Sequence, residues 1–213
     1  DWSVNEVMRT LRAFSLEENT LVVFTSDNGA VLQAQYRGNE DAAKEMHPDL
    51  TFGTNGPLRG GKQSTFEGGI RVPTFFTWSG TIPAGSETSQ PVSVSDILPT
   101  FLDMANIELP DDRDYDGLVV SDLLRGKPAD LDDRALFFGR DDAKAVRKGK
   151  WKLVLPQQPD FIENVSSEPM LFDLRKDLGE TRDLANKKPG KVDELLSLIQ
   201  TWEKDAHADT ISR

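Results

Sequence analysis

Asp27 and Asn28 follow an apolar stretch of the chain, and their side-chain oxygens could together bind a metal ion. Carboxylate and amide oxygens are hard ligands, the kind that Ca²⁺ and Mg²⁺ prefer. Gly29 comes next, and an Asn-Gly pair after a strand is also a common hairpin turn. On these residues alone, a divalent-cation site and a simple turn are both open.

A second group of chemically useful residues lies in the glycine-rich segment 56–73, which contains Arg59, Lys62 and Arg71. Glycines let the backbone approach a ligand closely, and a lysine ammonium is a compact charge that can meet an oxyanion. A structural salt bridge is the alternative for the arginines, and for Arg71 we favour one with Glu67. A divalent cation and a lysine in one site could together neutralise a tetrahedral anion and the bond being broken.

Residues 56–62 also match G-x-x-x-x-G-K, the pattern of a phosphate-binding P-loop. The match fails because Gln63 takes the place of the hydroxyl residue that binds magnesium, and because residues 51–55 do not form an apolar strand. The Gly-Gly pair and Pro73 that follow would also interrupt the helix that the motif requires. We therefore reject a P-loop and keep a simpler anion site.

His47 lies in the polar stretch 30–56, which has no clear periodicity. Ordered loops of this length are uncommon without a role, so we expect the stretch to border a site or to cross the surface. Contact between His47 and a substrate is one interpretation, and an ordinary surface histidine is the simpler one.

An apolar strand is expected to position Asp27 and Asn28. Residues 20–25 include five β-branched or aromatic residues and no charge, which predicts a strand buried on both faces. The helix expected before it, over residues 1–15, packs one apolar stripe inward, formed by Val4, Val7, Met8, Leu11 and Phe14. In open α/β sheets, ligands bind beyond the carboxyl ends of the strands, which is where Asp27 and Asn28 lie.

Further elements can be placed along the chain. Residues 74–78 predict a second apolar strand, and Ser95 or Asp96 can cap a helix that runs to about residue 105. The expected buried stripe of that helix is Ile97, Leu98, Phe101, Leu102 and Ala105. Later apolar pieces predict an antiparallel sheet, with strands at 135–138, 144–147, 151–155 and 170–174. A terminal helix follows, with an apolar face of Val192, Leu195, Leu196, Ile199 and Trp202.

The length of 213 residues allows one domain with a small appendage, and we divide the chain into residues 1–127 and 128–213. A hydrophobic fraction of 37% with 29% charged residues is typical of a soluble globular protein, and no apolar run is long enough to span a membrane. The net charge of −11 argues against a nucleic-acid binder. The absence of cysteine excludes disulfides and a thiol nucleophile within this sequence.

Residues 20–29, 56–62 and 67–73 together strongly resemble the type I sulfatases, members of the alkaline phosphatase superfamily. The resemblance continues in the family's order through nearly the whole chain, at 96–100, 116–117, 147–153, 171–174 and 179–180. It implies an α/β fold, in which residues 1–127 are the C-terminal portion of the sulfatase core. Residues 128–213 would then be the sulfatase C-terminal subdomain, a small antiparallel sheet with a terminal helix.

The resemblance also implies roles for individual residues. In that family an aspartate and an asparagine at the end of this strand hold the active-site calcium, and Asp27 and Asn28 match them. Ca²⁺ is therefore expected rather than Mg²⁺. The lysine of the glycine-rich segment binds the sulfate group, and Lys62 fits that place as a catalytic and substrate-binding residue. The implied reaction is hydrolysis of a sulfate ester, in which a formylglycine hydrate attacks sulfur and expels the alcohol.

The chain departs from the family's pattern in its early motifs. It contains neither the C/S-x-P-S/A-R motif that gives rise to formylglycine nor the early aspartate pair that completes the metal site. Calcium takes about six to eight oxygen ligands, more than Asp27 and Asn28 supply. The resemblance thus implies a C-terminal half whose partner is an N-terminal sulfatase chain or segment that carries the nucleophile. Chain and partner would act on a sulfated sugar or an aryl sulfate.

Alternatives to a sulfatase half remain open on the sequence. One is a non-catalytic, sulfatase-like fragment or binding module, and another is a related phosphonate monoester hydrolase, which shares much of this framework. Export to the periplasm or the extracellular space, or delivery to the lysosome, follows from the family resemblance only.

Overall fold

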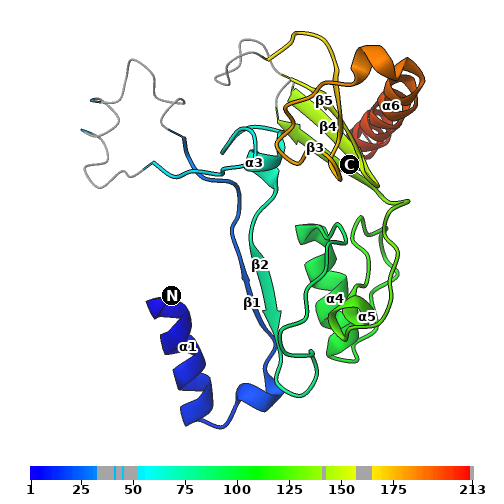
Figure 1. Ribbon diagram of the computed structural model, residues 1–213. Coiled ribbons are helices and arrows are strands. Elements are labelled where there is room, and N and C mark those ends of the chain that lie inside the picture. Colours follow the sequence, from blue (N-terminus) through cyan, green and yellow to red (C-terminus); the bar gives the residue numbers. More distant parts are fainter. Residues whose placement is uncertain (33–40, 42–44, 46–51, 141–142, 157–164, 212–213) are drawn as a thin grey trace. The chain divides into compact units, whose positions relative to one another are not determined.

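A computed structural model describes residues 1–32, 41, 45, 52–140, 143–156 and 165–211 (Figure 1). The chain divides into two compact units, each built from two separate stretches of sequence. The first unit comprises Asp1–Thr25 and Pro73–Asp132, and the second comprises Ser26–Val72 and Asp133–Arg213. The division of the chain at residue 127 into a core portion and a C-terminal subdomain stays a prediction.

The first unit begins with helix α1 (Trp2–Ala13), a 3-10 turn η1 (Glu17–Asn19) and strand β1 (Val22–Thr25). Strand β2 (Thr74–Thr77) runs antiparallel to β1, and Val22 lies opposite Thr77 (Figure 1). The helix and both strands confirm the elements predicted from the sequence.

The burial expected for these elements is not found. No residue of α1 is buried, and β1 is half-buried at its start and exposed at its end. Phe24 of β1 and Phe75 of β2 are 49% and 64% exposed. The physical reason is that, within the described residues, β1 and β2 form a two-stranded sheet with no layer packed over both faces. The predictions of a strand buried on both faces and of an inward stripe on α1 are therefore wrong for the described chain.

The rest of the first unit contains η3 (Val94–Asp96), α4 (Ile97–Met104) and α5 (Ser121–Leu124). A capping box starts this region, because Asp96 Oδ2 accepts the backbone N–H of Ser93 at 2.7 Å. The predicted apolar stripe of α4 is wrong, since Leu98 and Phe101 are exposed while Thr100 is buried. Thr100 Oγ1 accepts the N–H of Val120 at 3.0 Å. This hydrogen bond, to a residue 20 positions along the chain, keeps Thr100 on the inward face of α4.

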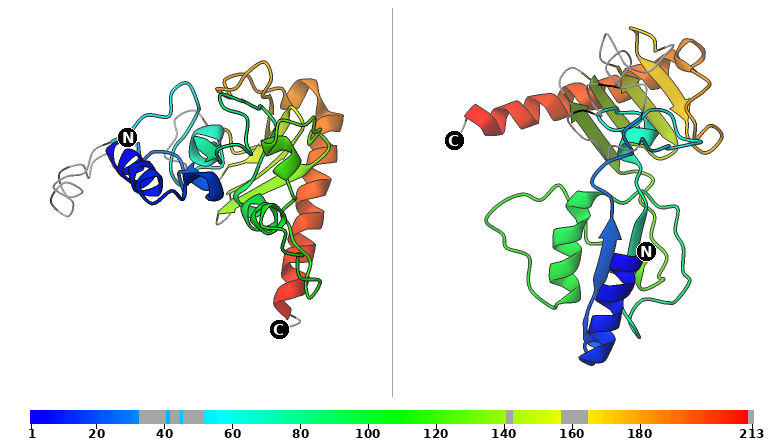
Figure 2. Two further views of the ribbon diagram at one scale, coloured as in Figure 1. Left: turned by 90° about the horizontal axis from the view of Figure 1, so that it is seen from below. Right: turned by 90° about the vertical axis from the view of Figure 1, so that its left-hand side faces the viewer.

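A four-stranded antiparallel sheet forms the frame of the second unit, in the order β3-β4-β5-β6. Its strands are β3 (Ala135–Arg140), β4 (Ala143–Lys148), β5 (Trp151–Leu155) and β6 (Met170–Asp173). The short turn η4 (Ala185–Lys187) precedes the terminal helix α6 (Pro189–Ile211), which lies along one face of the sheet (Figure 2). This part of the chain confirms the predicted sheet and helix.

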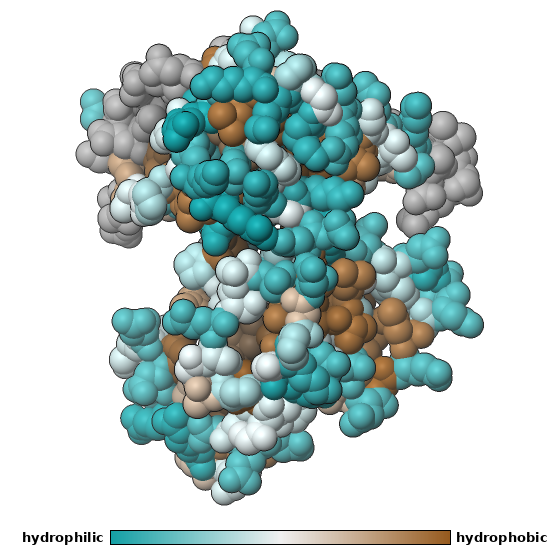
Figure 3. Space-filling view, turned by 45° about the vertical axis from the view of Figure 1, so that its right-hand side comes forward, coloured by the Kyte–Doolittle hydropathy of each residue, from teal (hydrophilic) through white to brown (hydrophobic). Residues whose placement is uncertain are grey.

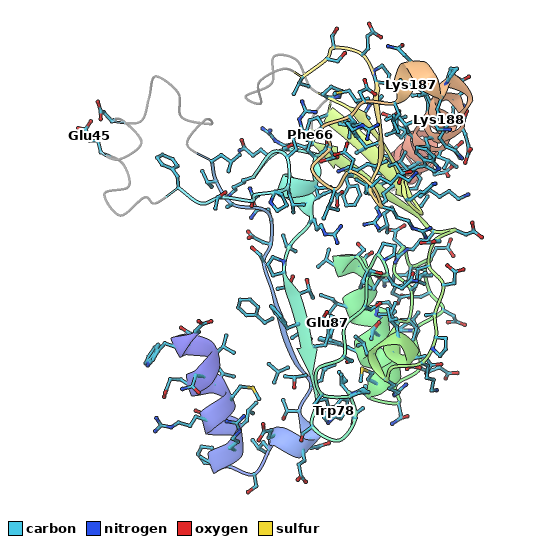
Figure 4. All side chains as sticks on the ribbon, in the orientation of Figure 1. Glu45, Phe66, Trp78, Glu87, Lys187 and Lys188 are labelled. Atoms are coloured by element: carbon cyan, nitrogen blue, oxygen red, sulfur yellow. The ribbon has the colours of Figure 1, made fainter. Side chains whose placement is uncertain are left out.

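Alternating residues of the sheet face opposite sides, as the period of a strand requires. Val146, Leu153 and Leu171 are register partners that pack against Leu195 and Ile199 of α6. Residues on the other face pack against Phe66, which precedes helix α3 (Glu67–Ile70): Ala145, Val154, Met170 and Phe172. The glycine-rich segment is therefore the layer that covers the second face of the sheet, with Phe66 as its apolar anchor (Figure 4).

No helix among the described residues combines the length and the apolar character needed to cross a bilayer.

Candidate functional site

The polar turn after β1 places the two predicted metal ligands side by side. Asn28 donates to Asp27 Oδ1 twice, from its backbone nitrogen at 3.0 Å and from Nδ2 at 2.6 Å. Ser26 Oγ donates to the Asn28 carbonyl at 2.9 Å and closes the turn. Asp27 is exposed and Asn28 is half-buried, so both side chains are accessible from solvent.

Gly29 fixes this turn against the glycine-rich segment. Its N–H donates to the Gly69 carbonyl at 2.9 Å, and a Cβ at position 29 would lie 1.7 Å from the Gly68 carbonyl oxygen. Only glycine permits so close an approach of two backbones. The Asp27–Asn28 turn is thus held against α3 by direct backbone contact.

Lys62 is tied to the same turn through its backbone. Its N–H donates to the Ala30 carbonyl at 3.0 Å, and the N–H of Ala30 donates to Asn55 Oδ1 at 2.9 Å. Asn55 Nδ2 also donates to the Gly60 carbonyl at 3.1 Å, so one amide side chain links both loops. The Lys62 side chain is exposed. The loops that carry Asp27, Asn28 and Lys62 therefore form one connected structure.

A buried ion cluster lies behind this loop. Lys152 Nζ lies 2.9 Å from both Glu67 Oε1 and Glu180 Oε1, and the side chains of all three residues are at most 2% exposed. Glu180 Oε2 accepts the backbone N–H of Glu67 at 2.6 Å. Buried charges are tolerated only when paired and hydrogen-bonded in this way. Lys152 points to the Phe66 side of the sheet because it alternates with Leu153, which packs on α6.

The two carboxylates of the cluster differ in their electrostatics. Burial acts to raise the pKa of Glu67, but Lys152, with help from Arg147 and Arg71, outweighs it and lowers that pKa below its ordinary value. Burial raises the pKa of Glu180 above its ordinary value, and Lys152 only partly offsets this effect. Glu67 has a second cation, Arg71, beside its other carboxylate oxygen, whereas the ion pair of Glu180 in the described part of the chain is with Lys152.

The two arginines of the glycine-rich segment have structural contacts. Arg71 Nη1 lies 3.3 Å from Glu67 Oε2, which confirms the predicted salt bridge. The Arg59 guanidinium lies 4.4 Å from the centre of the Phe66 ring, and its Nη1 donates to the Glu180 carbonyl at 3.0 Å.

His47 lies outside the described residues. No group of three or more His, Cys, Asp or Glu residues in the described part of the chain could hold a metal ion. The roles of Asp27, Asn28 and Lys62 as ligands stay predictions. Sequence reasoning missed the Lys152–Glu180 pair, although a lysine inside the apolar strand 151–155 was a usable signal for a buried ion pair.

The chain is similar in sequence to known proteins. A sequence profile of the family named Sulfatase matches residues 1–107. Steryl-sulfatase of Homo sapiens is 32% identical over 238 residues, which cover 99% of this chain and 39% of the relative. N-acetylgalactosamine-6-sulfatase of Canis lupus familiaris is 40% identical over 154 residues, 71% of this chain and 26% of the relative.

Solved structures agree with these matches. The crystal structure of Ps i-CgsB in complex with k-i-k-neocarrahexaose superposes with a TM-score of 0.73 and 26% identity, over 93% of this chain and 40% of that one. The chain thus spans about two fifths of the length of the human relative, at 39%, and of this structure, at 40%.

Proposed function

This chain belongs to the sulfatase family, whose members have an alkaline-phosphatase-like α/β fold, and we propose that it supplies one part of the active site of a sulfuric ester hydrolase. The observation that carries the proposal is the backbone hydrogen bond from Lys62 to Ala30, two residues beyond Asn28. It joins a loop with two oxygen ligands to a loop with one exposed lysine. Such a pair of loops suits one cation and one tetrahedral anion.

The donor set of Asp27 and Asn28 fits a hard divalent cation in part. Asn28 Nδ2 lies 2.6 Å from Asp27 Oδ1, so a turn of the amide about its Cβ–Cγ bond would present the carbonyl oxygen beside the carboxylate. We assign Ca²⁺ rather than Mg²⁺ because calcium accepts many oxygen ligands in flexible geometry. When bound, the cation would neutralise negative charge on the sulfate group. Asp27 and Asn28 would supply two of its ligands.

Lys62 is proposed to bind the sulfate group of the substrate. An ammonium at this place gives a charge-assisted hydrogen bond to a sulfate oxygen and offsets the charge that develops on the leaving oxygen. The backbone bonds of Lys62 and Gly60 hold the loop, so the backbone that carries the ammonium is already in place when the ester binds. The identity of the ester is proposed only at the level of class, as a sulfated sugar or an aryl sulfate.

The formylglycine nucleophile and the remaining metal ligands are proposed to come from an N-terminal sulfatase segment. Exposed apolar side chains of the first unit support such a partner, since Trp2 is 76% exposed and Phe24 and Phe75 are exposed as well. Figure 3 shows apolar residues, in brown, exposed on one face of the molecule. Phe24 and Phe75 are neighbours, with ring centroids 6.1 Å apart, and exposed apolar surface of this kind is typical of an interaction site. By itself the chain is then proposed to be inactive. Export or lysosomal delivery stays a proposal, which fractionation of the producing cells tests.

Reconstitution tests the proposed function. The chain is assayed with 4-nitrophenyl sulfate alone, and again when joined to or mixed with the N-terminal segment of its own polypeptide. We expect turnover only in the second case, with formylglycine detectable in that segment by mass spectrometry. A phosphonate monoester assayed in parallel separates a phosphonate hydrolase from a sulfatase. Absence of hydrolysis of either ester by the reconstituted protein would support a non-catalytic fragment instead.

A further inference from the structure

A single turn after β6 contacts both ends of the loop that carries Lys62. At the start of the loop, Arg59 Nη1 donates to the Glu180 carbonyl at 3.0 Å. At its end, the Glu67 backbone N–H donates to Glu180 Oε2 at 2.6 Å. Glu180 thus binds the loop on either side of Lys62, once through its backbone and once through its side chain.

The turn that presents Glu180 is itself well fixed. Asp177 accepts hydrogen bonds from the N–H of Thr181 at 3.1 Å, from Thr181 Oγ1 at 2.9 Å and from the N–H of Arg182 at 2.8 Å. Glu180 has a φ of 52°, a left-handed conformation that a glutamate adopts only where its surroundings impose it. The backbone of Glu180 is therefore fixed by its own turn, from which the carboxylate reaches the loop.

Lys152 links the loop and the Glu180 turn to the sheet. It rises from β5, lies 2.9 Å from both Glu67 and Glu180, and is fully buried. Apolar side chains of the same volume would fill this space at a lower desolvation cost. They would not fix the direction of the loop, whereas hydrogen bonds and ion pairs of set length do. The cluster thus couples the loop to the rigid part of the sheet.

We infer that Glu180 is a positioning residue for Lys62, which sets where the lysine ammonium lies relative to the Asp27–Asn28 turn. The inference rests on the proposed function for the identity of the anion, but the positioning itself does not depend on any activity. Loss of the Glu180 carboxylate releases the Glu67 end of the loop, and loss of the Arg59 guanidinium releases the other end. Both changes are expected to alter the surroundings of Lys62 without touching it.

NMR of the methylated lysines tests this inference in the chain as it stands. Reductive ¹³C-methylation labels the exposed Lys62, and Lys62→Arg identifies its signal. We expect Glu180→Ala to shift or broaden that signal and Glu180→Gln, which keeps an oxygen for the Glu67 N–H, to restore most of it. Glu194→Ala, a change to an exposed glutamate of α6, should leave it unaltered.

Arg59→Met is the second variant, which keeps the positioning testable if Glu180→Ala does not fold. It should also disturb the Lys62 signal, because it removes the bond to the Glu180 carbonyl. In the complete enzyme, Glu180→Ala should lower kcat/KM about 10-fold or more, since small misplacements of catalytic groups have large effects. An unchanged Lys62 signal in folded Glu180→Ala and Arg59→Met would overturn the inference. A changed signal, together with full activity of Lys62→Ala, would instead contradict the proposed function alone.

Discussion

The carboxylate of Glu180 accepts the backbone N–H of Glu67 at 2.6 Å, across 113 positions of sequence. This bond joins the turn after the last strand of the small sheet to the first residue of α3. Because Lys152 lies between the same two side chains, the glycine-rich segment is held by a fully buried network. The contribution of that network to stability and the proposed roles of Asp27, Asn28 and Lys62 can be tested separately.

Removal of the buried Lys152 ammonium should destabilise the second unit strongly. Lys152→Met leaves the Glu180 carboxylate without its ion-pair partner and Glu67 with its ion pair to Arg71, and breaking a buried ion pair in this way costs about 3–5 kcal/mol. We expect that loss in the free energy of unfolding, measured by urea denaturation. Lys187→Met, at an exposed lysine labelled in Figure 4, should change it by less than about 0.5 kcal/mol. Equal stability of the two variants would show that the cluster is not the support described.

The stability contributed by Glu180 should depend on pH. Its native pKa is raised by burial, so the folded chain holds this proton more tightly than the unfolded chain, whose pKa is near the ordinary value of 4.5. The stabilisation from that proton is fully present below the unfolded pKa and is lost as pH rises through the native pKa. Glu180→Gln cannot take up the proton. The stability of the wild type relative to this variant should therefore increase as pH falls from about 7 to about 4.5.

Urea denaturation of both proteins at several pH values in this interval measures that difference. A difference that decreases toward low pH would mean that Glu180 is ionised more readily in the folded chain than in water.

Gly29 should tolerate no side chain. In Gly29→Ala the new Cβ would lie 1.7 Å from the Gly68 carbonyl oxygen, so the Asp27–Asn28 turn must move away from α3. We expect a loss of about 1–3 kcal/mol in the free energy of unfolding. The matched control is Gly190→Ala, at a helical position with no atom within 4 Å of the added Cβ. It should be neutral or stabilising by up to about 1 kcal/mol.

Calcium binding should depend on the Asp27–Asn28 turn. In the complete protein, Asp27→Asn is expected to weaken the apparent calcium affinity about 10-fold or more, because it removes a charged oxygen ligand. Calcium titration after chelation, followed by calorimetry, measures this change. Asp205→Asn, at an exposed residue of α6, is the control and should bind calcium as the wild type does. Equal affinities of the two variants would remove Asp27 from the ligand set.

Local sequence patterns were sufficient to predict most elements of the fold. The antiparallel strands predicted at 144–147 and 151–155 and the face of α6 around Leu195 and Ile199 follow from apolar patterning and helical spacing, and the structure confirms both. The Arg71–Glu67 pair could also be predicted, because its members lie four residues apart, at the first residue of α3 and just after its end.

Features that depend on distant contacts were not predictable in the same way. The inward face of α4 is set by the bond between Thr100 and Val120, and the helical pattern favoured the apolar residues instead. The Glu180–Glu67 contact joins the two separate stretches of sequence that form the second unit, and no local periodicity predicts it. The exposure of Phe24 and Phe75 depends on which layers are present around β1 and β2, which their own composition does not reveal.

The most direct test of the proposed site is the effect of Lys62→Ala on sulfate ester hydrolysis by the complete protein. Truncation removes the ammonium while leaving the backbone bond to Ala30, so the loop is expected to stay in place. We predict a fall in kcat/KM of about 100-fold or more, by analogy with the loss of one transition-state donor, and little change for Lys187→Ala. Full activity of Lys62→Ala would contradict the assignment of this lysine to the sulfate group.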